Sequence, residues 1–227
     1  MKPKAEQEQR GAKRLTEIVF ILDRSGSMSD LVEDTIGGFN SMIQKQKDEE
    51  VNALVSTVLF DDKAVVLHDR LDILKVPEMT KKDYWARGTT ALLDAVGSSI
   101  RHISNIHKYA RKEDVPAKTM FVITTDGMEN ASKIYTLDKV KKMIKNQKNR
   151  YKWEFLFLGA NIDAISAARE IGIDEDHAVE YKNDSRGTTV LYQAVSDVIE
   201  ECCCCCCELP TTWKQSIEED LKKRKNQ

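Results

Sequence analysis

Cysteine is absent from this chain of 227 residues except for one run of six at positions 202–207. Neighbouring Cα atoms lie about 3.8 Å apart, which is too close for ordinary disulfide geometry. The run also lacks the separated ligand pairs of a zinc site. We assign it no function, with a redox or metal role for the cluster as the alternative. A chain that is otherwise free of cysteine agrees with a reducing compartment.

Long apolar runs and a strong net charge are missing as well. No stretch approaches the ~20 apolar residues of a membrane-spanning helix, and the polar tail at 1–14 lacks the apolar core of a signal peptide. The formal net charge is only −2, so neither nucleic acid nor an anionic membrane is indicated as a bulk partner. We therefore expect a cytoplasmic protein.

Motifs for nucleotide binding and for histidine chemistry are also lacking. The chain contains neither G-x-G-x-x-G nor G-x-x-x-x-G-K-[ST], the usual phosphate-binding patterns. Four histidines occur, and their spacing fits no metal site or catalytic triad; they are His68, His102, His107 and His177. We expect each of them to be a surface or packing residue.

The chain does contain an alternation of strand-like and helix-like blocks, which is typical of an α/β fold with a mostly parallel sheet. The length fits one such domain with tails. The blocks predict a domain at 15–201, a polar tail at 1–14 and a charged extension at 202–227. Strands are expected at 17–22, 51–60, 64–71, 118–125, 153–158 and 178–181.

Two local features refine this picture. The short turn Asp61-Asp62-Lys63 predicts that the second and third strands form an antiparallel hairpin at one edge of the sheet. Ser29 is the expected N-cap of the first helix, and Gly37-Gly38 within that helix predicts close packing against the sheet. Thr90 or Ala91 is expected to open the next long helix.

Oxygen-bearing side chains follow the first strand in an unusual pattern. The run Asp23-Arg24-Ser25-Gly26-Ser27-Met28 places an acid and two hydroxyls, spaced by two residues, in a tight turn. Oxygen ligands in a turn suit a small hard cation such as Mg²⁺. Taken alone, the run is also compatible with a loop and a helix cap.

Two further segments add oxygen ligands. Thr90 lies in Gly88-Thr89-Thr90, and Asp126 follows the fourth strand in Thr124-Thr125-Asp126-Gly127. The carboxyl ends of parallel strands meet at one edge of a sheet, where ligands bind. Two carboxylates neutralise a divalent cation, and the hydroxyls complete its shell without adding charge. An open coordination position would then attract an external carboxylate.

These segments, together with the flanking Ile18–Leu22 and Ala91–Ala95, resemble a von Willebrand factor A (VWA) domain with a complete metal-ion-dependent adhesion site (MIDAS). The resemblance covers roughly residues 15–200. It implies a Rossmann-like sheet with one antiparallel edge strand, helices on both faces, and one Mg²⁺ or Mn²⁺. The implied ligands are Asp23, Ser25, Ser27, Thr90 and Asp126, with Thr89 as a substitute for Thr90. Family serines bind the metal directly and the acids often act through water, and the polar leader suggests the intracellular bacterial or phage type.

The resulting hypothesis is a non-enzymatic module that binds a protein partner through one of the partner's Asp or Glu residues. Residues expected to contact the partner around the site are Arg24, Met28, Arg87, Met128, Glu129 and Asn161. Core packing is the alternative role for the methionines, and a helix cap is the alternative for Asn161. The alternative function is a Mg²⁺-dependent hydrolase or phosphoryl-transfer enzyme with Asp23 as nucleophile. Against it, no second acid and no phosphate-clamping lysine stand beside Asp23.

Overall fold

The computed structural model describes residues 14–160, 163–204, 209–210 and 212–225. Most of the polar tail and three positions of the cysteine run lie outside these ranges. The strands are β1 (Thr16–Asp23), β2 (Ala53–Phe60), β3 (Ala64–Asp72), β4 (Lys118–Thr125), β5 (Glu154–Ala160) and β6 (Ala178–Tyr181). All six predicted strands are present, and their ends differ from the predictions by at most two residues.

The six strands form one sheet in the order β3-β2-β1-β4-β5-β6. Every neighbouring pair is parallel except β2 and β3, which form the antiparallel hairpin at the edge. The central strands β1 and β4 are buried on both faces, as the strands of a parallel sheet covered by helices are. The predicted fold class, a mostly parallel Rossmann-like sheet with one antiparallel edge strand, is confirmed.

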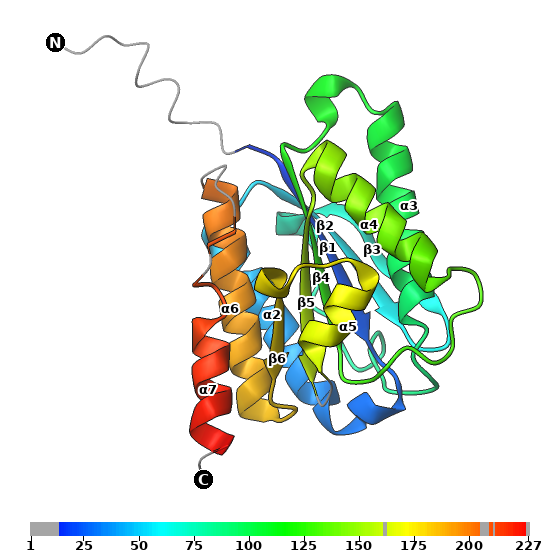
Figure 1. The fold of residues 1–227 in the computed structure, drawn as a ribbon. Helices are drawn as coiled ribbons and strands as arrows, with labels where there is room; N and C mark the ends of the chain where they lie inside the picture. The colour runs from blue at the N-terminus through cyan, green and yellow to red at the C-terminus, as the bar shows by residue number, and fades with distance from the viewer. Residues whose placement is uncertain (1–13, 161–162, 205–208, 211, 226–227) are drawn as a thin grey trace, which may run out of the picture.

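Helices cover both faces of this sheet (Figure 1). One layer contains α2 (Val32–Asp48) and α6 (Ser185–Cys204), and the other contains α3 (Leu92–Tyr109), α4 (Leu137–Tyr151) and α5 (Ala164–Ile171). Strand side chains point alternately to opposite faces. Phe20 and Leu22 of β1 therefore join the core of the first layer, and Val19 and Ile21 join that of the second. No helix in the described ranges is long and apolar enough to cross a membrane.

The first long helix begins later than predicted. Residues Gly26–Leu31 form a 3₁₀ helix, η1, and α2 starts at Val32 with Leu31 at its N-cap and no capping side chain. Ser29 is therefore not the cap. The tighter 3₁₀ turn folds the chain back directly after β1, which keeps the hydroxyls of the loop close to the end of that strand. The start of α3 is as predicted, with Ala91 at the N-cap.

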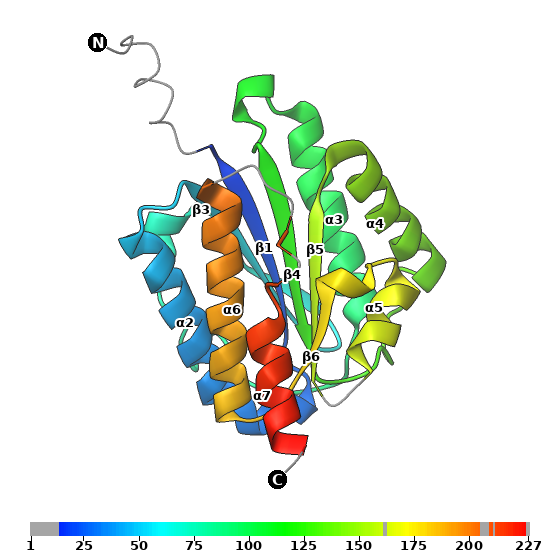
Figure 2. The ribbon, with the colours of Figure 1, turned by 60° about the vertical axis from the view of Figure 1, so that its left-hand side comes forward.

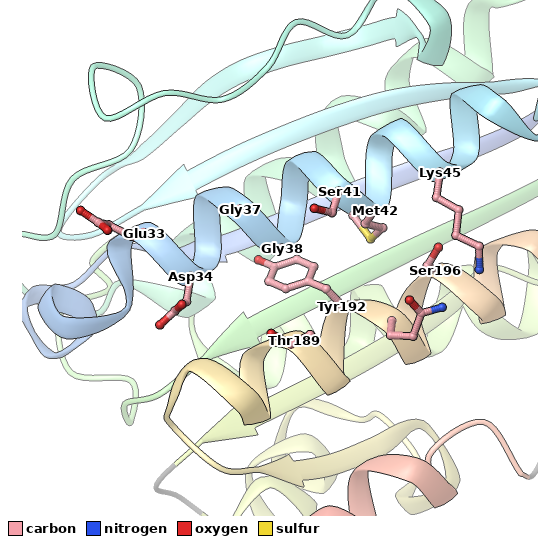
Figure 3. Close-up of a pocket in the computed structure, with 11 residues that line it drawn as sticks. Glu33, Asp34, Gly37, Gly38, Ser41, Met42, Lys45, Thr189, Tyr192 and Ser196 are labelled. Atoms are coloured by element: carbon pink, nitrogen blue, oxygen red, sulfur yellow. The ribbon is translucent and has the colours of Figure 1, made fainter.

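The Gly37-Gly38 pair permits close packing, but its partner is a helix and not the sheet. A Cβ at Gly38 would lie 2.3 Å from a ring carbon of Tyr192 on α6, while nothing lies within 4 Å of the same position at Gly37. The Tyr192 ring lies against α2 (Figure 3). A groove of about 310 Å³ runs between the two helices, and none of the predicted metal ligands lines it.

The C-terminal region, predicted as a charged extension, packs against the first helical layer. The helix α6 continues past the predicted boundary, and Cys202 and Cys203 are buried. A further helix, α7 (Gln215–Lys225), lies beside α6 (Figures 1 and 2). Trp213 and Ile217 of this region join the core of the first helical layer. Apolar side chains beyond position 201 thus contribute to this core.

Candidate metal site

The candidate ligands meet at the carboxyl edge of the sheet. The parallel strands β1 and β4 pair with Leu22 opposite Thr124, so both end at this edge. Asp23 is the last residue of β1, and Asp126 directly follows β4. Thr90 comes from the loop that precedes α3. The sheet topology thus brings three segments that are distant in the sequence to one place.

Hydrogen bonds join four of the five candidate ligands. Oδ1 of Asp23 accepts the backbone N–H of Ser25 at 2.7 Å. The hydroxyl oxygens of Ser25 and Ser27 lie 3.1 Å apart. Ser27 in turn donates its hydroxyl to Oδ1 of Asp126 at 2.6 Å. The two carboxylates are therefore linked through the serine loop into one polar cluster.

Thr90 lies next to this cluster and is buried, whereas Thr89 is exposed. The side-chain oxygen of Asn130 accepts the Thr90 N–H at 3.0 Å, and the Asn130 N–H donates to the Thr90 carbonyl at 3.1 Å. A Cβ at Gly127 would lie 3.3 Å from the Thr90 hydroxyl oxygen and 3.9 Å from that of Ser27. Both hydroxyls therefore border the same glycine, and this position favours Thr90 over Thr89 as a ligand.

Asp23 is fully buried, and both of its carboxylate oxygens accept hydrogen bonds. Its Oδ2 accepts the Thr125 hydroxyl at 2.6 Å. Burial raises the pKa of Asp23, hydrogen bonds from Thr125 and Ser25 oppose that rise, and the negative charge of Asp126 adds to it. No basic side chain in the described ranges forms an ion pair with either acid. Two close acids without a cation leave negative charge that a bound cation would neutralise.

The donor set consists only of oxygen atoms, from two carboxylates and three hydroxyls. Hard cations such as Mg²⁺ and Mn²⁺ prefer oxygen ligands. Within the part of the chain that the structure describes, no group of three or more His, Cys, Asp or Glu could hold a metal. The candidate site differs from such a cluster because hydroxyls supply most of its donors. Its residues fit one hard divalent cation.

Neighbouring segments hold the loop after β1 in place. The Arg24 N–H donates to the carbonyl of Phe60, the last residue of β2, at 2.8 Å. The buried Tyr84 hydroxyl donates to the Asp23 carbonyl at 2.5 Å. These two bonds hold the N–H and the C=O of the peptide group between Asp23 and Arg24, so the backbone at the start of the loop is fixed.

Two residues at the site were missed by the sequence reasoning. Thr125 lies inside a quoted motif, but its bond to Asp23 depends on how β1 and β4 pair. Asn183 follows β6, and its amide nitrogen lies 3.4 Å from Oδ2 of Asp126. The sequence signal for Asn183 is its place just after a strand that is predicted to be parallel to β1 and β4. Such a strand ends at the same edge as they do.

Two of the residues expected to contact a partner are buried. Arg24 and Met28 are each only 2% exposed, so a contact role for them is wrong, because both side chains pack inward. Glu129 is half-buried, and its carboxylate accepts the N–H groups of Leu93 at 2.8 Å and Ser132 at 2.7 Å. A contact role for Glu129 stays a prediction.

The other expected contact residues have different outcomes. Arg87 is exposed, and Met128 is 75% exposed directly after the site. Asn161 lies outside the described residues. Trp85 was not predicted, yet it is exposed in the same loop as Arg87.

No family model matches the chain, and no curated protein matches its sequence. Solved structures do match. The vWF domain of the type V pili tip protein Mfa5 from Porphyromonas gingivalis has a TM-score of 0.61 at 9% identity, covering 85% of this chain and 97% of that one. The PilB minor pilin from Streptococcus sanguinis has a TM-score of 0.59 at 12% identity, covering 85% of this chain and 63% of that one.

A third match is proximal thread matrix protein 1 from the mussel byssus, in a structure with a zinc-occupied MIDAS motif. Its TM-score is 0.53 at 16% identity, and the match covers 84% of this chain and 46% of that one. At these identities the likeness establishes the fold. The chain therefore has the fold of a von Willebrand factor type A domain.

Proposed function

We propose that this chain is a metal-dependent protein-interaction module. One Mg²⁺ or Mn²⁺ is held by five side chains, and the metal in turn binds an Asp or Glu carboxylate of a partner protein. The proposed metal-binding residues are Asp23, Ser25, Ser27, Thr90 and Asp126. The metal supplies a positively charged centre with a free position for the partner's oxygen.

The observation that carries this proposal is the pair of buried carboxylates without a cation. Asp23 and Asp126 are both buried at the carboxyl edge, and hydrogen bonds of the Ser25 backbone N–H and of the Ser25 and Ser27 hydroxyls link them. Burying a charge that has no counter-charge is costly, and proteins keep such arrangements mainly at functional sites. A divalent cation between the two acids would remove this cost.

The choice of an acidic partner follows from charge. The negative charge of two protein carboxylates equals but does not exceed the charge of a divalent cation, and the three hydroxyls add no further negative charge. Hard cations accept carboxylate oxygens readily, so an Asp or Glu from outside suits the remaining position. Two of the structural matches are pilus proteins and the third has a metal in a MIDAS motif, which supports a binding role with a metal. Cytoplasmic location stays a prediction.

The alternative function is a Mg²⁺-dependent hydrolase or phosphoryl-transfer enzyme. A carboxylate nucleophile needs a free oxygen that substrate can reach. Asp23 offers no such oxygen, because the side chain is fully buried and both of its carboxylate oxygens accept hydrogen bonds. This supports a module without hydrolytic turnover. Mg²⁺-dependent hydrolysis of p-nitrophenyl phosphate that is lost in Asp23→Asn would favour the enzyme instead.

The direct test compares two adjacent threonines by calorimetric titration with Mn²⁺. The wild-type chain should bind about one ion. Thr90→Ala should weaken binding by about tenfold, since it removes one shell oxygen, while both backbone hydrogen bonds between residue 90 and Asn130 remain. Thr89→Ala is the matched control and should bind like the wild type. Absence of saturable binding by the wild type, or equal loss in both variants, would contradict the proposed site.

A further inference from the structure

The segment 84–90, which we call the strap, runs along the loop that carries the proposed metal ligands. The Arg87 N–H donates to the Arg24 carbonyl at 2.8 Å, and the Gly26 N–H donates to the Gly88 carbonyl at 3.2 Å. The buried Tyr84 hydroxyl supplies a third connection, as described above. The strap is therefore fixed beside the site by backbone and side-chain hydrogen bonds.

Trp85 of the strap is held by two arginines. The guanidinium of Arg24 lies over its ring at 4.8 Å from the centroid, and that of Arg87 lies at 5.5 Å. Both guanidiniums pair with the same oxygen of the buried Asp61, at 2.9 and 2.8 Å. Cation–π contacts of this kind stabilise an indole ring in one orientation. The ring is thus fixed although much of it faces solvent.

Trp85 differs from the other two tryptophans of the chain. It is 42% exposed, whereas Trp153 and Trp213 are 4% and 7% exposed. An exposed tryptophan that is already held in place loses little conformational freedom on binding. Tryptophan is also among the residues most often found at the energetic centre of protein interfaces. Trp85 therefore has the properties of a preformed contact residue.

The charges around the ring indicate what it would contact. Arg24 and Arg87 share Asp61, and Asp62 stands close by, since a Cβ at Gly88 would lie 3.1 Å from its Oδ1. The charges of these two arginines and two aspartates balance, so Arg24 and Arg87 are already occupied and are not free to bind a second acid. The exposed part of the indole ring is left for an apolar contact.

We propose that Trp85 is the second contact point for the partner. It packs against an apolar or aromatic side chain that lies within a few residues of the acid bound by the proposed metal. The inference rests on the proposed function and adds to it the chemistry of the recognised segment, which is one acid with an apolar neighbour at a fixed spacing.

The test uses a random peptide library displayed on phage, because no partner needs to be known. The library is panned on the immobilised full chain in Mg²⁺ buffer and eluted with EDTA. Peptides eluted from the wild type should share one Asp or Glu and one apolar or aromatic residue at a fixed spacing. Peptides eluted from Trp85→Ala should keep the acid and lose the apolar preference. A peptide selected on the wild type should bind Trp85→Ala about tenfold more weakly or worse.

The outcomes separate this inference from the proposed function. If the acid is shared but the apolar preference persists on Trp85→Ala, the contact at Trp85 is refuted while the metal-dependent function stands. If no pool contains a shared acid, or EDTA elutes nothing, the metal-dependent function fails and this inference fails with it.

Two controls guard against a folding defect. Tyr109→Ala removes another exposed aromatic at the far end of α3, about 27 Å from the start of that helix, and should select the same peptides as the wild type. Quenching of tryptophan fluorescence by acrylamide needs no variant, since Trp85 is the one tryptophan with substantial exposure. A selected peptide should reduce the quenching, and unchanged quenching at saturation would overturn the contact.

Discussion

The two ends of β1 each contain a buried acid, and the two acids have opposite surroundings. Glu17, near the start of the strand, is fully buried and pairs with Arg70 at 2.5 Å and with His107. Asp23, at the end of the strand, is equally buried and pairs with no basic side chain of the described residues. The two lie about 20 Å apart on the same face of the sheet. One acid is compensated inside the molecule, and the other is not.

This difference separates a structural ion pair from the proposed metal site. Arg70, the partner of Glu17, lies in an irregular part of β3. Its φ is +50°, and the pairing of β3 with β2 shifts register there. Such backbone conformations are uncommon for residues other than glycine. At the other end of the strand, Arg24 follows Asp23 directly in the chain but pairs with Asp61. The first acid is thus neutralised by a side chain of the described residues, and the second is the acid for which we propose a metal.

The largest effect should come from removing the uncompensated acid. Asp23→Ala takes away one of two metal carboxylates, so Mn²⁺ affinity should fall by at least about a thousandfold, or ~4 kcal/mol. Without metal, the free energy of unfolding should fall by no more than roughly 1–3 kcal/mol, because the lost hydrogen bonds from Ser25 and Thr125 are offset in part by removal of a buried acid that has no counter-charge. Calorimetric titration and urea unfolding measure the two quantities. Tight metal binding by the variant would remove Asp23 from the site.

The compensated acid should behave in the opposite way. Glu17→Gln leaves the charge of Arg70 without its buried partner, so the free energy of unfolding should fall by roughly 3 kcal/mol. Mn²⁺ affinity should stay as in the wild type, because the change lies at the amino end of β1, opposite to the proposed metal site. Urea unfolding and the same titration test both statements. A variant that stays fully stable but loses metal would reverse the comparison.

A smaller effect is expected from one methyl group at the site. Gly127→Ala would place its Cβ 3.3 Å from the Thr90 hydroxyl oxygen, so that hydroxyl must shift and Mn²⁺ affinity should fall by about tenfold. Gly37→Ala is the same substitution in α2 with nothing within 4 Å. It should leave metal binding unchanged and stabilise the helix by roughly 0.5–1 kcal/mol. Equal metal affinity in the two variants would argue against a site that borders Gly127.

The smallest expected effect concerns a third buried titratable group, His68 of β3. Its Nδ1 lies 3.0 Å from the Thr57 hydroxyl oxygen, and burial lowers its pKa below the ordinary value of 6.5. The unfolded chain therefore takes up the proton first, so stability present above pH 6.5 is lost as the pH falls toward the folded pKa. Urea unfolding of the wild type at pH 7.5 and 5.5 should show this loss, and His68→Asn should reduce it. Identical pH dependence in both proteins would assign the loss to other groups.

The strands and the meeting of the ligand segments could be predicted because they depend on local pattern and on one rule of topology. Apolar runs bounded by turns indicate the strands, and parallel strands end at one edge. The 3₁₀ helix before α2 was missed because Ser29 followed by acids is also typical of an N-cap. The helix α7 was missed because its sequence is mostly polar.

Which of the expected contact residues are exposed could not be predicted from the sequence. Arg24 and Arg87 are the same residue type near the same site, yet one is buried under Trp85 and the other is exposed. Their sequence context does not distinguish them, since the exposure of each arginine depends on how the strap lies against the loop after β1. The sequence alone does not distinguish Trp85 from a buried tryptophan, because its exposure depends on the tertiary structure.

By itself, the sequence determined which chemical groups follow each strand: two acids and three hydroxyls at the ends and loops of a parallel sheet. Those identities are covalent, and strand direction brings them together. Only the tertiary structure decided which charges are compensated. It pairs Glu17 with Arg70 and turns Arg24 toward Asp61, away from Asp23. Burial and ion pairing arise between segments that are far apart in the chain, so no local pattern contains them.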